Sequence, residues 1–489
     1  MRDAVVPKRS LGFKTVTQGA NPALARAGLE QAPPDGEQKS DLKKRTYGSV
    51  LLGIYIFLLI SRVLDISRIA LLHIPMIMLG CLMIGALAQK GGWKGAISSK
   101  ATLFYGALNV WILVCFPLSS WRGGSLPYVI LSLESFVVYL IVVQLIKTSG
   151  DWRFVAGAYA YAVLVAAILS FFLSKTVNGR ISLASGTLAD PNEFALTLVL
   201  GLPFWFYKIS EAGPLKKILY LGLTVPILIS FGRAGSRSGL LALGALFLVM
   251  LLFAGVKQKA IMTGVAVLAL VLGAVLLPDY LKARFTTLFS SSGGAHLDLE
   301  DRVSLHSDVA SSEAREMLLR ESLQLTVQHP IFGVGPGIFA DSAWNLARTE
   351  GSRGGPAQVS HNTYTQLSSE IGIPGFLFFT LTMLVCAKYG ISDYRRLSAS
   401  GPSITKGSLY MFAAMAALAV GVFFLTLGYS MLLSVMFGLA VSLHGVANSE
   451  TAGGETIETE QPALLPRRPA APALKPKRIR NPVRLGRQR

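Results

Sequence analysis

Apolar runs, each close to the length that crosses a membrane, recur along most of this chain and constrain its fold more than any other feature. They lie at 47–63, 69–88, 101–119, 127–146, 154–173, 193–207, 216–231, 238–256, 259–277, 371–391, 408–425 and 427–446. A helix of about 20 such residues spans the hydrocarbon core of a bilayer, and only 15% of the 489 residues are charged. The sequence therefore predicts an all-α polytopic membrane protein with about 12 transmembrane helices.

The runs divide the chain into five parts. Residues 46–277 hold the first nine predicted helices, and residues 371–446 hold the last three. The polar segment 278–370 lies between them. Residues 1–45 and 447–489 are basic tails, the second of them rich in proline, and we expect both to be disordered because they have too few apolar residues to bury.

Lysine and arginine in the loops predict the orientation of the chain. Five basic loops share one side with both tails, and they lie at 89–100, 147–153, 208–217, 257–259 and 388–407. By the positive-inside rule this side faces the cytoplasm, so segment 278–370 faces outward. The formal net charge of +19 is then explained by orientation signals and contact with anionic lipid, and no nucleic-acid partner is expected.

Two arginines, Arg233 and Arg237, lie in a short loop on the outward side, where the positive-inside rule disfavours them. They either lie solvated or against lipid phosphate at a helix end, or they form an anion site. If the segment is helical, their i, i+4 spacing places both on one face. A guanidinium group can donate two parallel hydrogen bonds to phosphate oxygens, and it stays charged at any working pH.

The outward segment contains a predicted helix between residues 305 and 328, which Pro330 ends. Its two central arginines, Arg315 and Arg320, are about 140° apart around such a helix, so they cannot both face one ligand. Three alternate glycines follow at 333–337. Their spacing is not that of a phosphate-binding loop, and we interpret them as a tight turn.

Polar residues also lie where two outward loops enter the next helix. His361, beside Asn362 and Tyr364, either caps the helix or acts as a general base, because imidazole titrates near neutral pH. Asp190 and the proline after it make a good helix start, and Asn192 follows; the same residues alternatively line the rim of a site. No histidine or cysteine spacing is typical of a metal site.

Four segments in this order resemble the O-antigen ligase and polysaccharide polymerase superfamily. They are 186–195 with Asp-Pro-Asn-Glu, 235–241 with Gly-Ser-Arg-Ser-Gly-Leu-Leu, 315–339 with His-Pro-Ile-Phe-Gly-Val-Gly-Pro-Gly, and 361–375 with His-Asn-Thr-Tyr and Glu-Ile-Gly-Ile-Pro-Gly. The resemblance covers residues 180–390 or so. It implies a membrane glycosyltransferase of the C type with one large helical periplasmic loop, in the bacterial inner membrane with both termini cytoplasmic.

The resemblance also implies the reaction and its residues. Such enzymes are inverting and independent of metals and cofactors, and they transfer or polymerise glycan from an undecaprenyl-diphosphate carrier. The acceptor is a hydroxyl of a lipid, glycan or protein, and ligase and polymerase both stay open. Carried over to this chain, the catalytic residues are Arg237, Arg315 and His361. We assign Arg233, Asp190, Asn192, Asn362 and Tyr364 to substrate binding.

Two other classes stay open as alternatives. A polysaccharide or lipid transporter or flippase tends to carry charges at mid-membrane and often has internal repeats. Here Glu134 is the clearest acid within a predicted span, and the sequence shows no repeat. A non-catalytic assembly scaffold is the other alternative.

Overall fold

A computed structural model describes residues 46–66, 74–89, 93–177, 179–183, 187–276, 282, 299–349, 357–398 and 402–459. The predicted tail at 1–45 and most of the one at 447–489 lie outside these residues. The described part is almost entirely helical, as predicted. One two-stranded antiparallel hairpin, β1 (Ser174–Val177) with β2 (Arg180–Leu183), is an addition that the sequence did not predict.

Every predicted apolar run falls on a helix. These helices are α2 (Tyr47–Ser61), α3 (Ile74–Ala88), α5 (Lys100–Cys115), α6 (Arg122–Leu145), α7 (Ser149–Phe172), α8 (Pro191–Glu211), α9 (Pro214–Ala234), α10 (Arg237–Phe253), α11 (Val256–Leu276), α15 (Thr363–Leu397), α16 (Pro402–Gly421) and α17 (Met431–Thr459). Among the described residues, 8 helices are long and apolar enough to cross a membrane. Helices α2, α3 and α10 are apolar but shorter, and α8 belongs to neither group. The predicted count of twelve spans is therefore not confirmed.

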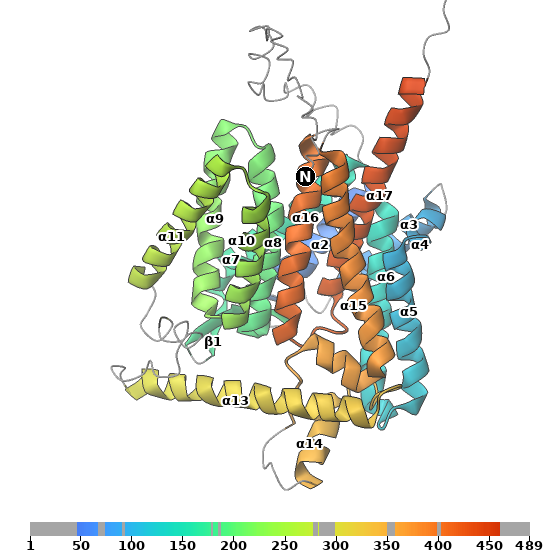
Figure 1. Cartoon of the computed structure of the whole chain (residues 1–489), viewed down its shortest axis with the longest axis vertical. Helices are drawn as coiled ribbons and strands as arrows, with labels where there is room; N and C mark the ends of the chain where they lie inside the picture. The colour runs from blue at the N-terminus through green and yellow to red at the C-terminus, as the bar shows by residue number, and fades with distance from the viewer. Residues whose placement is uncertain are drawn as a thin grey trace, which may run out of the picture.

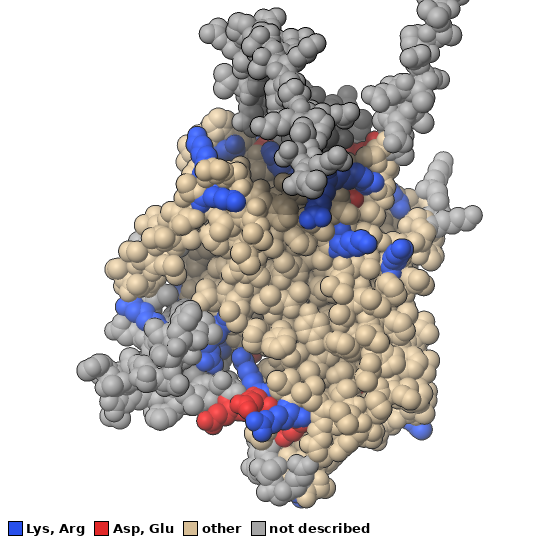
Figure 2. Space-filling model, viewed as in Figure 1, with Lys and Arg blue, Asp and Glu red and all other residues tan. Residues whose placement is uncertain are grey.

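The helices lie side by side with their ends at two levels (Figure 1). The first described residues, the end of α17 and the turns after α8 and α15 lie at one end, and the β-hairpin lies at the other. In Figure 2 the visible Lys and Arg side chains gather towards these two ends, with a largely uncharged band between them. Which end faces the cytoplasm stays a prediction.

Helix α13 (Leu299–Gln328) lies across the hairpin end of the bundle, and α14 (Phe339–Thr349) follows it (Figure 1). The predicted helix at 305–328 is confirmed, and it ends two residues before Pro330. A small apolar core made of Leu318, Leu325, Val334, Ile338, Phe339 and Ala343 joins α13 to the segment after it and to α14. This core fixes the rotation of α13 about its axis, and with it the direction of Arg315.

The glycine-containing segment 330–339 packs against a break in α15. Gly372 has a φ of 73° and interrupts the helix, close to the predicted start of the span at 371. The amide of Gly335 donates to the carbonyl oxygen of Glu370 at 2.9 Å. A Cβ atom on Gly333 would collide with the backbone of Glu370, and one on Gly372 would collide with Ile331. Glycine is therefore required both in segment 330–339 and at the break in α15, because the two backbones touch there.

The remaining short helices connect these elements. They are η1 (Val63–Ile66), α4 (Lys94–Ile97), η3 (Phe116–Leu118), η4 (Thr187–Ala189) and η5 (Val422–Phe424). The main core runs through most of the bundle and contains fully buried aromatic residues such as Trp152 and Trp205. Their indole N–H groups donate to Leu439 O at 3.1 Å and to Thr224 Oγ1 at 2.8 Å. Because both indole N–H groups have acceptors, burying the rings leaves no hydrogen-bond donor unsatisfied.

Candidate active site at the hairpin end of the bundle

Five charged or titratable side chains from five parts of the chain meet at the hairpin end. They are Arg180 on β2, Asp190 before α8, Arg237 at the start of α10, Arg315 on α13 and His361 before α15. Arg315 and Asp190 both act electrostatically on His361, and Arg237 and Asp190 both act on Arg315. The structure thus brings the three predicted catalytic residues together. We call these five residues the arginine cluster.

Arg315 enters this cluster with an unsatisfied hydrogen-bond donor. Its Nε atom is buried and has no hydrogen-bond partner among the described residues. Burial, followed by the charge of Arg237, lowers the pKa of its guanidinium group, and Asp190 opposes the shift. Arg320 instead lies exposed and pairs with Glu316 at 2.7 Å. The prediction that Arg315 and Arg320 face different directions is confirmed.

His361 has a left-handed backbone with a φ of 51°, which is uncommon for a residue other than glycine. Its amide donates to Thr426 Oγ1 at 2.9 Å, which fixes this backbone. Its ring makes no hydrogen bond to any residue that the structure describes. Burial lowers the pKa of the imidazole, Arg315 lowers it further, and Asp190 opposes both. The ring is therefore neutral near pH 7, and a neutral imidazole can accept a proton.

Asp190 and Asn192 hold the start of α8 and its neighbours. Asp190 Oδ1 accepts from the amides of Asn192 at 2.6 Å and Glu193 at 3.1 Å, so it caps the helix as predicted. Asn192 Oδ1 accepts from Arg180 Nη2 at 2.7 Å and from Ser236 Oγ at 2.9 Å. Asn192, which the sequence assigned to substrate binding, thus ties β2 to the residue before α10. It positions both Arg180 and the start of the helix that carries Arg237.

Arg180 is the member of the cluster that the sequence analysis missed. Its Nε donates to the carbonyl oxygen of Ala234 at 2.9 Å. Burial lowers the pKa of its guanidinium group to about 10, Asp190 opposes this shift, and Arg315 and Arg237 add to it. One signal was available, because Arg180 is a basic residue in an outward loop. The same argument singled out Arg233 and Arg237.

The expected pairing of Arg233 with Arg237 on one helix face is wrong. Gly235 has a φ of 57° and ends α9, so Arg233 belongs to α9 and Arg237 opens α10. The guanidinium carbon of Arg233 lies 5.6 Å from the centre of the Phe171 ring. Arg233 thus packs on an aromatic face of α7, and its charge is not among those that act on Arg180, Arg315 or His361.

Asn362 and Tyr364 use their polar atoms within the fold. Asn362 Oδ1 accepts from the amides of Tyr364 at 2.9 Å and Thr365 at 3.2 Å, so the helix cap considered for His361 belongs to its neighbour. The hydroxyl of Tyr364 donates to Ala419 O on α16 at 3.1 Å. Its ring packs against Phe379 with the centres 5.7 Å apart. Both residues hold the entry of α15 in place beside His361.

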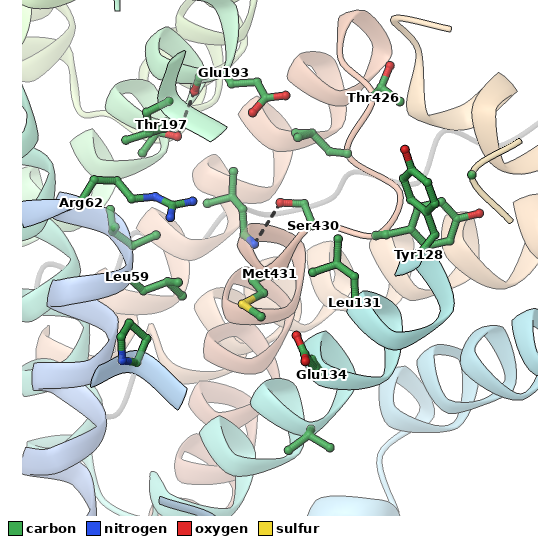
Figure 3. Close-up of a pocket in the computed structure, with 18 of the residues that line it drawn as sticks. Leu59, Arg62, Tyr128, Leu131, Glu134, Glu193, Thr197, Thr426, Ser430 and Met431 are labelled. Atoms are coloured by element: carbon green, nitrogen blue, oxygen red, sulfur yellow. Dashed lines mark hydrogen bonds between the residues drawn. The ribbon is translucent and has the colours of Figure 1, made fainter. Parts of the chain in front are cut away.

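A cavity of about 890 Å³ lies next to the cluster. Its walls come from α2, α3, α6 and α8 and from the segments around residues 337–340, 359–366 and 426–432. Val359 and Ser360, which precede His361, line it, and so does Thr426, which accepts from the His361 amide. Figure 3 shows Arg62, Glu134 and Glu193 extending from different helices towards this space. The cavity and the arginine cluster therefore share a wall.

A comparison with protein families decides the identity of this part of the chain. The family model described as O-Antigen ligase matches residues 222–380. Residues 222–380 belong to the O-antigen ligase superfamily. The matched O-antigen ligase domain contains Arg237, Arg315 and His361, and the fold adds Arg180 and Asp190 from outside it. This family supports a membrane glycosyltransferase of the O-antigen ligase and polymerase type. A comparison with curated proteins gave no match.

Proposed function

We propose that the protein transfers a glycan from an undecaprenyl-diphosphate carrier to an acceptor hydroxyl, on the periplasmic face of the inner membrane. One observation carries the proposal. Three arginines and a neutral histidine from separate elements meet beside a cavity large enough for a sugar-bearing ligand. Transfer of a diphosphate-linked sugar uses a cation to stabilise the leaving diphosphate and a base to take the proton of the acceptor hydroxyl.

The arginines stabilise the departing diphosphate. Negative charge builds up on the diphosphate as its bond to the sugar breaks, and positioned donors lower the energy of that state. A guanidinium group suits phosphate oxygens because it can donate two parallel hydrogen bonds. The buried Nε of Arg315, which lacks a partner in the described part of the chain, is one donor that a diphosphate oxygen would satisfy. Among the described residues no group of three or more His, Cys, Asp or Glu could hold a metal ion, so the arginines are the cations that the site offers.

His361 acts on the acceptor. A ring nitrogen of its neutral imidazole takes the proton of the acceptor hydroxyl as the oxygen attacks the anomeric carbon. The bond from that carbon to the diphosphate oxygen breaks, and the diphosphate leaves with the electron pair. Attack from the face opposite the leaving group inverts the configuration at the anomeric carbon. Asp190 favours the imidazolium that forms, because its negative charge raises the pKa of His361.

The orientation that the reaction requires has a direct test. Reporter fusions at Gly294 and Gly354 should indicate a periplasmic location, and fusions at Gly213 and Ser400 a cytoplasmic one, because basic loops are retained inside. A cytoplasmic signal at Gly354 would contradict the orientation and, with it, access to a periplasmic donor.

The reaction itself is tested with purified protein in proteoliposomes that contain a glycan-loaded carrier and candidate acceptors. We expect transfer by the wild type and a loss of about 10–100-fold in Arg315→Lys, because a point charge cannot reproduce a forked contact. Arg320→Lys, on the exposed side of the same helix, is the matched control and should be nearly silent. Equal losses in both variants, or no product from the wild type with any acceptor, would contradict the proposal. A transporter or scaffold would give no product at all.

A further inference from the structure

The cavity beside His361 differs in charge from the arginine cluster. Glu134 on α6 and Glu193 on α8 line it, together with Arg62 after α2 (Figure 3). Neither of these two carboxylates makes a hydrogen bond or an ion pair with another side chain in the described part of the protein. Glu370 also lines the cavity, but it is engaged, since it accepts from the hydroxyl of Tyr429 at 2.8 Å. Glu134 and Glu193 are thus available to bind a ligand.

Carboxyl groups without a partner in the protein favour one kind of ligand. A carboxyl group without a partner in the protein needs hydrogen bonds from its occupant, and it can form them with hydroxyl groups in either protonation state. Without them its removal from water is costly. A sugar supplies several hydroxyl groups that both donate and accept hydrogen bonds, whereas the oxygens of an ionised phosphate group only accept them. The acids therefore favour a sugar with free hydroxyl groups over a second phosphate group beside the donor's diphosphate.

The other walls of the cavity fit a sugar attached to a lipid. Tyr128, which is exposed, contributes an aromatic ring on whose face the C–H side of a sugar can pack. On the α2 and α3 side the lining is apolar, with Leu59, Leu79 and Met83. A pocket with one apolar side and a few convergent polar groups is typical of a site for an amphipathic ligand.

The position of the cavity assigns the occupant its role. Ser360 and Thr426 line it, and both adjoin the backbone of His361, Ser360 as the preceding residue and Thr426 through a hydrogen bond from the His361 amide. A sugar in the cavity would therefore lie next to the segment that carries the proposed base, while the diphosphate of the donor stays on the arginines. The anionic donor and the hydroxyl-rich acceptor would thus bind at separate, neighbouring sites.

We propose that this cavity is the acceptor pocket and that Glu134 and Glu193 determine its specificity, selecting an acceptor that ends in an uncharged, hydroxyl-bearing sugar over a phosphorylated one. The proposal rests on the proposed function and names the acceptor class for it. Glu134 and Glu193 are specificity-determining residues here, and the proton is still removed by His361.

Equilibrium binding tests this proposal without any need for turnover. Purified protein in lipid nanodiscs is titrated with short-chain alkyl glycosides of glucose, galactose, mannose and N-acetylglucosamine, and with the 6-phosphate of each. We expect the wild type to bind at least one neutral glycoside at least about tenfold more tightly than its phosphate. Glu134→Gln and Glu193→Gln keep the shape and replace the carboxyl group by an amide, and each should weaken neutral binding about tenfold, the scale of one hydrogen bond. Glu134→Lys should reverse the preference.

Two further measurements complete the design. Glu450→Gln, an exposed acid near the opposite end of α17, is the matched control and should bind both classes of glycoside like the wild type. Undecaprenyl diphosphate binding, measured on the same samples, should be unchanged in the Gln variants. The acceptor proposal is overturned if no glycoside binds, if neutral and phosphorylated forms bind equally, or if both Gln variants match the wild type. Failure of the wild type to bind undecaprenyl diphosphate would count against the proposed function instead, and the glycoside result would still decide the pocket.

Discussion

At the end of the helix bundle opposite the hairpin, which we call the tail end, two buried carboxylates have hydrogen-bond partners, whereas three ionisable side chains around the candidate site have none among the described residues. At the tail end, Asp151 is fully buried and accepts from hydroxyl and amide groups, and Asp393 pairs with both Arg396 at 3.0 Å and His444 at 2.8 Å. Around the site, Arg315 Nε has no partner among the described residues. The carboxylates of Glu134 and Glu193, as described above, have none either.

This difference separates structural charges from functional ones. An unpaired charge in a buried position costs several kcal/mol or more, and most native polar groups avoid it. Where a fold retains such groups together in a cavity, a ligand is the expected partner. The comparison therefore predicts that changes at the tail end reduce stability, whereas changes at the site reduce activity and leave stability intact.

The largest expected effect is that of His361→Ala. It should lower turnover by about 10²–10⁴-fold, the usual range for loss of a general base. Donor binding and the melting temperature should stay near those of the wild type, because the ring has no partner in the described structure and the arginines hold the diphosphate. Transfer and undecaprenyl diphosphate binding are measured on the same purified variant.

His329→Ala, at an exposed position after α13, is the control for that variant. His361→Asn separates the two roles considered for this residue, since Asn adopts the left-handed backbone readily but cannot serve as a base. Near-normal transfer by His361→Asn would contradict the catalytic role. Loss of donor binding would instead make His361 a phosphate ligand.

The next effect is on stability and tests the other side of the comparison. Asp151 accepts from Ser49 Oγ at 2.6 Å, from Thr148 Oγ1 at 2.9 Å and from the amide of Thr46 at 3.2 Å. Asp151→Ala leaves these donors without an acceptor, at a cost of about 1–3 kcal/mol for each that stays buried. The melting temperature in detergent should fall, while the protein that stays folded keeps its specific activity. Asp341→Ala, at an exposed position of α14, should leave both unchanged. A normal melting temperature in Asp151→Ala would break the comparison.

The sequence predicted the helices well because the bilayer imposes a length on each apolar run. It also predicted α13 and its end, since a proline and three glycines follow. The grouping of Arg237, Arg315 and His361 came from a resemblance, because these residues are far apart in the chain and no periodicity links them.

What the sequence missed depends on contacts between distant segments. Arg180 lies on a strand of four residues, which is too short to give a periodic signal. The pairing of Arg233 with Arg237 failed because the left-handed Gly235 separates two helices. The cavity is lined by residues from Tyr55 to Leu432, so no local pattern could reveal it. Single residues were identified correctly where local rules decide, as with Asp190 at its helix cap.

A smaller effect concerns pH. Burial and then Arg315 lower the pKa of His361 below its usual value of 6.5. Activity needs the neutral ring, so it should be constant above that value and fall as pH decreases through the lowered pKa. Asp190 raises the pKa of His361, so Asp190→Asn should move this acid limb to lower pH. The limb is measured as kcat/KM against pH for both proteins. A limb above pH 6.5, or one that moves upward in Asp190→Asn, would contradict the electrostatic description of the cluster.

The smallest effect is expected for Tyr364→Phe, a residue that the sequence assigned to substrate binding and the structure places in the helix packing. Its hydroxyl donates to Ala419 O at 3.1 Å, and its loss should reduce the free energy of unfolding by about 0.5–1.5 kcal/mol. Acceptor KM and donor binding should change less than twofold, because the ring still packs against Phe379. A tenfold rise in acceptor KM with a normal melting temperature would return Tyr364 to the binding site. It would also show that a satisfied hydrogen bond does not by itself separate structural residues from functional ones in this protein.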